Sequence, residues 1–115
     1  MKQLLITTLI ACASITAVAH SDHAPRVAAC IGNPCTKDQV EKGLPTALDI
    51  LISKGAIDGT WKSLTAESVE EKKFKKNTEW VAKFADPKQK DDKKKNLYVF
   101  ITQKGFLSGS NFTGE

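Results

Sequence analysis

The amino-acid sequence predicts an α+β domain, with one N-terminal helix packed on a three- or four-stranded antiparallel sheet. Between residues 36 and 55 the apolar residues recur at spacings of three and four, which is the period of an amphipathic helix. Beyond residue 66 the period changes to two, and the apolar segments are rich in β-branched and aromatic residues, as strands are. One helix followed by consecutive strands is typical of a helix that covers one face of an antiparallel sheet.

The helix is predicted to begin after Thr36. Thr36 can cap it, and Gln39 stands three residues further on, as a capping box requires. Six apolar residues then form one stripe along the helix: Val40, Leu44, Ala47, Leu48, Leu51 and Ile52. Lys54, as a basic residue of the last turn, and Gly55 at the C′ position are expected to close the helix.

Pro45 conflicts with this helical pattern, because it lies nine residues after the cap. A proline has no backbone N–H to donate, and its ring clashes with the preceding turn. We therefore expect the helix to kink or split near Glu41 and Lys42.

Four segments after the helix are predicted to form the sheet, at residues 68–75, 79–84, 97–102 and 106–113. The first is highly charged, which favours an edge position, since charge discourages pairing with other chains. In the second, Trp80, Ala82 and Phe84 face one way at a period of two. The third is dense in β-branched and aromatic residues and is predicted to be central. The last is weakened by Gly109.

The connecting segments are predicted to be turns and loops. Residues 75–78 and 103–105 form short turns, and residues 86–96 form a longer loop. Five lysines within residues 88–95 are interpreted as part of a solvated loop; the alternative is contact with anionic lipid or an acidic partner. The layout resembles cystatin-like and PepSY-type folds, an architecture that serves many functions.

The aromatic residues are interpreted as the core of the domain rather than the lining of a ligand pocket. Trp61, in a connector rich in Gly and Thr, is expected to pack the helix onto the sheet. The full set is Trp61, Phe74, Trp80, Phe84, Tyr98, Phe100, Phe106 and Phe112.

Residues 1–19 are predicted to be a signal peptide. Lys2 supplies a positive charge, residues 4–13 are apolar, and residues 17–19 form a small-residue cleavage site. Cleavage would place the mature protein in the periplasm or outside the cell. The alternative is a lipobox at residues 9–12, which would make the protein a lipoprotein anchored at Cys12.

The remaining chain is divided into a tail or lead-in at residues 20–35 and a single α+β domain at residues 36–115. The leader carries one of the 17 basic residues and none of the 13 acidic ones, so the mature net charge is +3. This charge is too small to indicate nucleic-acid binding. No stretch after the leader approaches the ~18 apolar residues that a membrane span requires.

Cys30 and Cys35 remain as an even pair after cleavage. In an oxidising compartment such a pair forms a disulfide, and the turn residues between them, Gly32, Asn33 and Pro34, favour the approach of the sulfurs. A loop this short constrains the unfolded chain by roughly 2 kcal/mol. The alternatives are a redox pair, because Cys35 adjoins a helix N-terminus, and a metal site shared with His20 and His23 in the reduced form.

Several motifs resemble the pattern of a small, uncharacterised family of exported proteobacterial proteins that carry a domain of unknown function. These motifs are Trp61-Lys62, Val69-Glu70-Glu71-Lys72-Lys73-Phe74, Glu79-Trp80-Val81, Leu97-Tyr98-Val99-Phe100 and Asn111-Phe112-Thr113-Gly114. The likeness covers roughly residues 36–114 and implies a periplasmic domain without assigning an activity. Members of the family often carry a His-rich stretch after the leader, where this chain has two histidines.

The mature N-terminus is the first candidate for a metal site. His20 would offer its α-amine and its imidazole, Asp22 a carboxylate, and His23 a second imidazole. These ligands suit Cu(II) or Ni(II) in tetragonal geometry, and Zn(II) less selectively.

The sequence favours a small periplasmic binding module that is not an enzyme. Both histidines lie in the tail, so the domain has no imidazole to act as a base near pH 7. The module would bind a divalent metal through its tail. The alternative is a protein-interaction or inhibitor module without a metal, in which residues 68–75 or the lysine loop contact a periplasmic partner.

Overall fold

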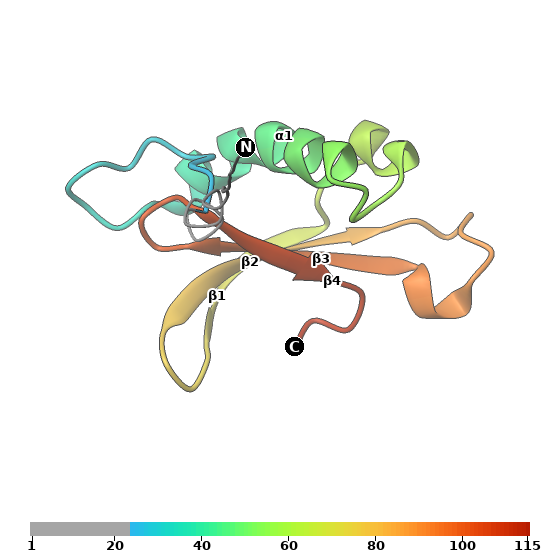
Figure 1. Ribbon diagram of the computed structural model, residues 1–115. Helices are drawn as coiled ribbons and strands as arrows, with labels where there is room; N and C mark the ends of the chain where they lie inside the picture. The colour runs from blue at the N-terminus through green and yellow to red at the C-terminus, as the bar shows by residue number, and fades with distance from the viewer. Residues whose placement is uncertain (1–23) are drawn as a thin grey trace, which may run out of the picture.

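The computed structural model describes residues 24–115 and contains one α-helix and one four-stranded antiparallel sheet. Helix α1 (Lys37–Ser53) is followed by β1 (Ser68–Lys73), β2 (Thr78–Ala85), β3 (Asn96–Thr102) and β4 (Leu107–Asn111). The strands lie side by side in sequence order, so β1 is an edge strand and β3 is central. Figure 1 shows α1 lying across one face of the sheet. The predicted fold class is confirmed.

Helix α1 begins and ends close to the predicted residues. The capping box is present, since the Gln39 N–H donates to Thr36 Oγ1 at 3.2 Å and the Thr36 N–H donates to Gln39 Oε1 at 2.9 Å. Gly55 follows with a φ of +77°, which only glycine adopts without strain. Lys54 is the C-cap residue rather than part of the last turn, which has no basic residue. The apolar stripe is buried except at Ile52, which is half-buried.

Of the two expected effects of Pro45, a kink or a split, the split is wrong. Helix α1 runs without interruption from Lys37 to Ser53, with Pro45 inside it. Pro45 lies on the exposed side of the helix, away from the core. The buried residues before and after the proline belong to one cluster with the sheet, and this packing keeps the helix continuous despite the missing N–H donor.

The core lies between α1 and the sheet. Alternate residues of the strands point toward the helix: Val69, Trp80, Ala82, Phe84, Leu97, Val99, Ile101 and Leu107. Trp61, on the short 3₁₀ helix η2 (Gly59–Ser63), is only 1% exposed and belongs to the same cluster. The predicted packing role of Trp61 is therefore confirmed.

The residues before α1 form a lead-in that is bonded to the far end of the chain. The backbone N–H groups of Val27 and Ala28 both donate to the Gly105 carbonyl, at 2.8 and 3.1 Å. The Leu107 N–H donates to the Pro25 carbonyl at 2.8 Å. Gly43 of α1 lies against the Val27 carbonyl, where a side chain would not fit. The lead-in is thus packed between α1 and the β3–β4 turn.

The opposite face of the sheet carries no helix within residues 24–115, and we call it the open face. Val81 and Phe100 pair on it at the centre of the sheet. Both side chains are buried, yet neither belongs to the core cluster. Phe74 lies against Phe100 edge to face, with ring centroids 5.9 Å apart. The expectation that all eight aromatic residues form one core is therefore wrong, because the strict alternation of strand residues sends some rings to each face.

The strand ends differ from the prediction by a few residues. Strand β1 ends at Lys73 because the next residue, Phe74, donates its N–H to the Asn77 carbonyl within the turn. Strand β4 is shorter than predicted and contains a bulge opposite Phe100 and Ile101. The loop between β2 and β3 contains one 3₁₀ turn, η3 (Asp92–Lys94). No helix among the described residues has the length and apolar character to cross a membrane.

Candidate functional site

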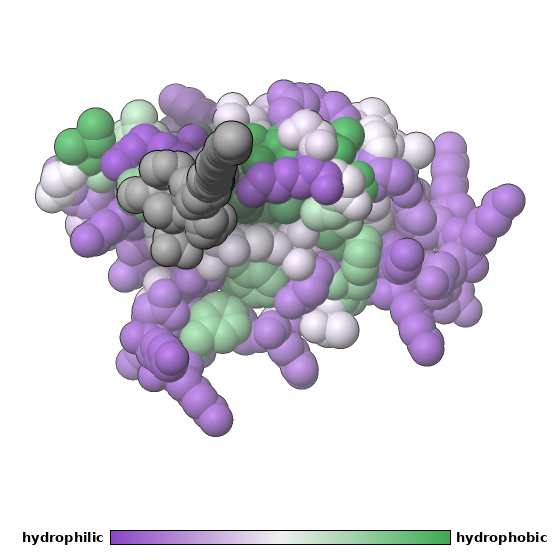
Figure 2. Space-filling view, viewed as in Figure 1, coloured by the Kyte–Doolittle hydropathy of each residue, from purple (hydrophilic) through white to green (hydrophobic). Residues whose placement is uncertain are grey.

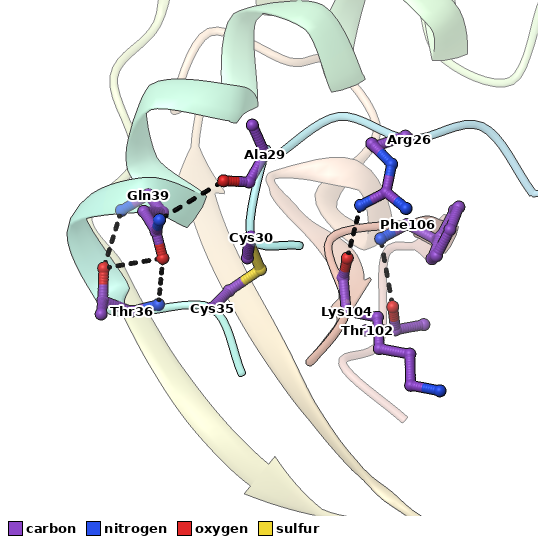
Figure 3. The surroundings of a disulfide bond; sticks show 9 residues. All are labelled: Arg26, Ala29, Cys30, Cys35, Thr36, Gln39, Thr102, Lys104 and Phe106. Carbon is purple, nitrogen blue, oxygen red and sulfur yellow. Dashed lines mark hydrogen bonds between the residues drawn. A yellow bond between two sulfur atoms is a disulfide. The ribbon is translucent and has the colours of Figure 1, made fainter. Parts of the chain in front are cut away.

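A disulfide joins Cys30 and Cys35 and closes a six-residue loop at one end of the molecule. Both cysteines are buried and belong to the core cluster. The Cys35 N–H donates to the Gln103 carbonyl at 2.8 Å, which ties the loop to the β3–β4 turn. Figure 3 shows the disulfide between the start of α1 and this turn. The predicted disulfide is confirmed, and in this oxidised form the sulfurs cannot act as thiolate ligands.

The loop carries Ile31, whose side chain is 79% exposed. Ile31 is the one large hydrophobic side chain that is exposed among residues 24–115. The loop is too short for this side chain to fold back, because Gly32 turns at a φ of +86° and the Asn33 N–H donates to the Cys30 carbonyl. Ile31 was not predicted from the sequence as a functional residue. The only indication of its exposure was its position inside a closed loop whose two ends are both fixed in the core.

Beside Ile31 lies a groove of about 450 Å³ between the loop and the β3–β4 turn. The Arg26 guanidinium stacks on the Phe106 ring at 4.4 Å from its centroid. Arg26 Nη1 also donates to the Lys104 carbonyl at 3.1 Å (Figure 3). These contacts hold the cation in one orientation, since stacking and a hydrogen bond act together.

The groove is basic. Arg26 and Lys104 line it, and none of its lining residues is acidic. Figure 2 shows hydrophobic surface at this end of the molecule with hydrophilic atoms around it. An exposed apolar side chain beside the fixed Arg26 guanidinium is an arrangement typical of a protein-binding surface. We call Ile31 together with this groove the loop surface.

The predicted metal ligands His20, Asp22 and His23 lie outside the described residues, as do Cys12 and the signal peptide. Within residues 24–115 no group of three or more His, Cys, Asp or Glu side chains is arranged to hold a metal ion. The structure does fix the point at which this segment joins the domain. Pro25, two residues after His23, is bonded to Leu107 beside the loop surface.

The lysine loop lies at the opposite end of the sheet, and most of its side chains are exposed (Figure 1). Lys95 is the exception, because its Nζ donates to the carbonyls of Pro87 and Gln89 at 3.0 and 2.8 Å. Across from this loop, the hydroxyl and backbone N–H of Thr60 both bond Asp58 and hold the pKa of its carboxyl below the usual range. These contacts are internal to the loop and its neighbour.

The chain matches no curated protein and no solved structure. A family model, described as a family of unknown function, matches residues 1–115. The protein belongs to this family, DUF6488.

Proposed function

We propose that the protein is a small exported binding module of the periplasm, without enzymatic activity, that recognises another protein through the loop surface. The observation that carries this proposal is Ile31, a 79% exposed isoleucine on a loop closed by a disulfide. A closed loop loses little conformational entropy on binding, so most of the contact energy is retained as affinity.

The chemistry of the partner follows from the loop surface. Ile31 requires an apolar pocket, which would bury the side chain away from water. Arg26 and Lys104 require acidic groups around that pocket. This differs from the two surfaces expected from the sequence, residues 68–75 and the lysine loop, since neither presents an exposed large apolar side chain.

The test of this surface uses the mature chain as bait in extracts of the extracytosolic compartment. We expect one stoichiometric partner, bound about 30-fold more weakly by Ile31→Ala, as for a central apolar contact. Lys90→Ala, an exposed change in the distant lysine loop, is the matched control and is expected to bind like the wild type. Equal affinity of the Ile31→Ala and wild-type proteins for the purified partner would overturn the proposal.

Metal binding by the mature N-terminus is the second proposed function. It rests on the ligand set of His20, Asp22 and His23 beside a free α-amine, which suits Cu(II) better than Zn(II). The domain side of this segment is held at Pro25, whose carbonyl accepts a hydrogen bond from the Leu107 N–H at 2.8 Å.

Two measurements test the second function. The intact mass of the exported protein would show whether it begins at His20, as the leader predicts, or at a lipidated Cys12. Cu(II) titration would then compare this protein with its His20→Ala/His23→Ala variant. We expect the variant to lose the tight site. The same Cu(II) affinity in both proteins would exclude the tail as the ligand.

A further inference from the structure

A second hollow lies on the open face, away from the loop surface. It has a volume of about 310 Å³ and is bordered by Phe74, Asn77, Glu79, Phe100 and Ser108, among others. Glu79, on β2, points to this face because its strand neighbour Trp80 points into the core. We call this hollow the Glu79 pocket.

Glu79 is a carboxylate that is buried at 9% exposure. Its oxygen Oε2 accepts hydrogen bonds from Asn77 Nδ2 at 3.1 Å and from Ser108 Oγ at 3.2 Å. Both donors are neutral, and no ion pair within residues 24–115 includes Glu79. The other oxygen, Oε1, accepts no hydrogen bond from the described part of the chain. Oε1 is not fully buried, and Glu79 is one of the residues that line the pocket.

The bulge in β4 supplies one of the donors to Glu79. Phe100 pairs with Gly109 and Ile101 with Leu107, which leaves Ser108 as the extra residue. A bulge redirects the side chain of the extra residue, and here the Ser108 hydroxyl is turned onto Glu79. The carboxylate is therefore held in one orientation by bonds to Oε2, while Oε1 is left available.

The cross-strand neighbour of Glu79 forms no ion pair with it. Lys72 is the cross-strand partner of Glu79, but its Nζ donates to the Gly114 carbonyl at 3.0 Å. The Lys72 ammonium lies 5.5 Å from the centroid of the Phe74 ring, so this ring already faces one positive charge. No ion pair among the described residues therefore gives Glu79 a cationic partner, and a bound cation would supply one.

We propose that the Glu79 pocket binds a small organic ammonium ion. The ammonium donates to Glu79 Oε1, and the alkyl part of the ligand lies along Phe74 and Phe100. A hydrogen bond between ionised groups is stronger than a neutral one, and an aromatic wall adds attraction to a cation. A hollow of about 310 Å³ accommodates a short amine. This site is separate from the loop surface, and its existence does not depend on the proposed function.

The test is a titration of the full mature chain, labelled with ¹⁵N, with n-butylammonium. We expect saturable shifts of the backbone amide signals of residues around the pocket, with Glu79 and Ser108 among them. Glu79→Gln keeps the shape of the side chain and removes its charge, and we expect binding about tenfold weaker or weaker still. n-Butanol, which has the same alkyl chain and no charge, is expected to cause no saturable shift.

Two further variants keep the test decisive. Glu70→Gln removes the same charge from a neighbouring strand without lining the pocket, and we expect it to bind like the wild type. Phe74→Leu removes the aromatic wall, and we expect binding about threefold weaker. The proposal is overturned if the amide shifts of the wild type do not saturate with n-butylammonium. It is also overturned if Glu79→Gln and Glu70→Gln weaken the binding of n-butylammonium equally. Circular dichroism confirms that each variant is folded.

Discussion

The two faces of the sheet use the same strands for opposite purposes. The face under α1 is lined by apolar side chains that belong to one cluster with the helix and the lead-in. The open face carries charged groups such as Lys72 and Glu79 beside Phe74 and Phe100. The covered face therefore supplies stability, and the open face has side chains free for contact with other molecules. The first candidates for functional residues in this small domain are therefore those outside the core cluster.

The largest expected effect on stability comes from a comparison of substitutions at two neighbouring residues of β2. Phe84 points into the core and is almost fully buried, whereas Lys83 points to the open face and pairs with Glu67 across 3.6 Å. Phe84→Ala is expected to lower the free energy of unfolding by about 3–5 kcal/mol, because it leaves a cavity. Lys83→Ala is expected to change it by about 0.5 kcal/mol or less. Urea unfolding measures both, and similar losses would contradict the division between the faces.

Removal of the disulfide is expected to have the next largest effect. Cys30→Ala/Cys35→Ala releases a loop of six residues, which costs about 2 kcal/mol in the chain-entropy account. The measurement is the free energy of unfolding of the variant against that of the oxidised wild type. Reduced wild-type protein is the control and is expected to match the variant. An unchanged stability would show that the lead-in holds the loop without the covalent bond.

Gly43→Ala tests the packing of the lead-in on α1. In an exposed helix this change stabilises by about 1 kcal/mol. Here the new methyl group would meet the Val27 carbonyl, so we expect a loss of about 1–2 kcal/mol instead. Thermal unfolding gives the sign directly. A gain in stability would mean that the lead-in moves away from the helix at little cost.

The smallest expected effect lies on the open face. Lys72→Met keeps most of the apolar stem but removes the ammonium that bonds the Gly114 carbonyl. We expect a loss of less than about 1 kcal/mol, because Lys72 is an exposed residue. Faster hydrogen exchange at the Gly114 amide should accompany it, since residues 113–115 lose one of their contacts. A large loss of stability would show that the open face also supports the fold.

Local patterns in the sequence were sufficient to predict most of the architecture. The capping box of Thr36 and Gln39 and the period-two spacing of Trp80, Ala82 and Phe84 act over a few residues, so each can be recognised without knowledge of the rest. Strand β1 was correctly predicted to be an edge strand from its charge alone. The split expected at Pro45 was wrong because this residue lies outside the apolar stripe, and packing of the stripe on the sheet keeps the helix continuous.

The candidate sites depend on contacts that the sequence does not display. Ile31 is exposed because both ends of its loop are fixed by residues far along the chain, such as Gln103 and Gly105. Glu79 accepts a hydrogen bond from Ser108 because a bulge in β4 turns this hydroxyl toward it. Neither the exposure of Ile31 nor the environment of Glu79 is indicated by a local pattern in the sequence. The disulfide between Cys30 and Cys35 was predictable, since five positions of separation are enough to suggest it.

The bonds between the lead-in and the β3–β4 turn also have a consequence for the order of folding. Arg26 and Lys104 are 78 residues apart, whereas the sheet is built from consecutive hairpins that close over short distances. Contacts at long separation form slowly, because the intervening chain must first be ordered. We expect α1 and the hairpins to assemble first and the N-terminal segment to dock last. Docking of this segment would then await synthesis of residues 103–107, which it contacts.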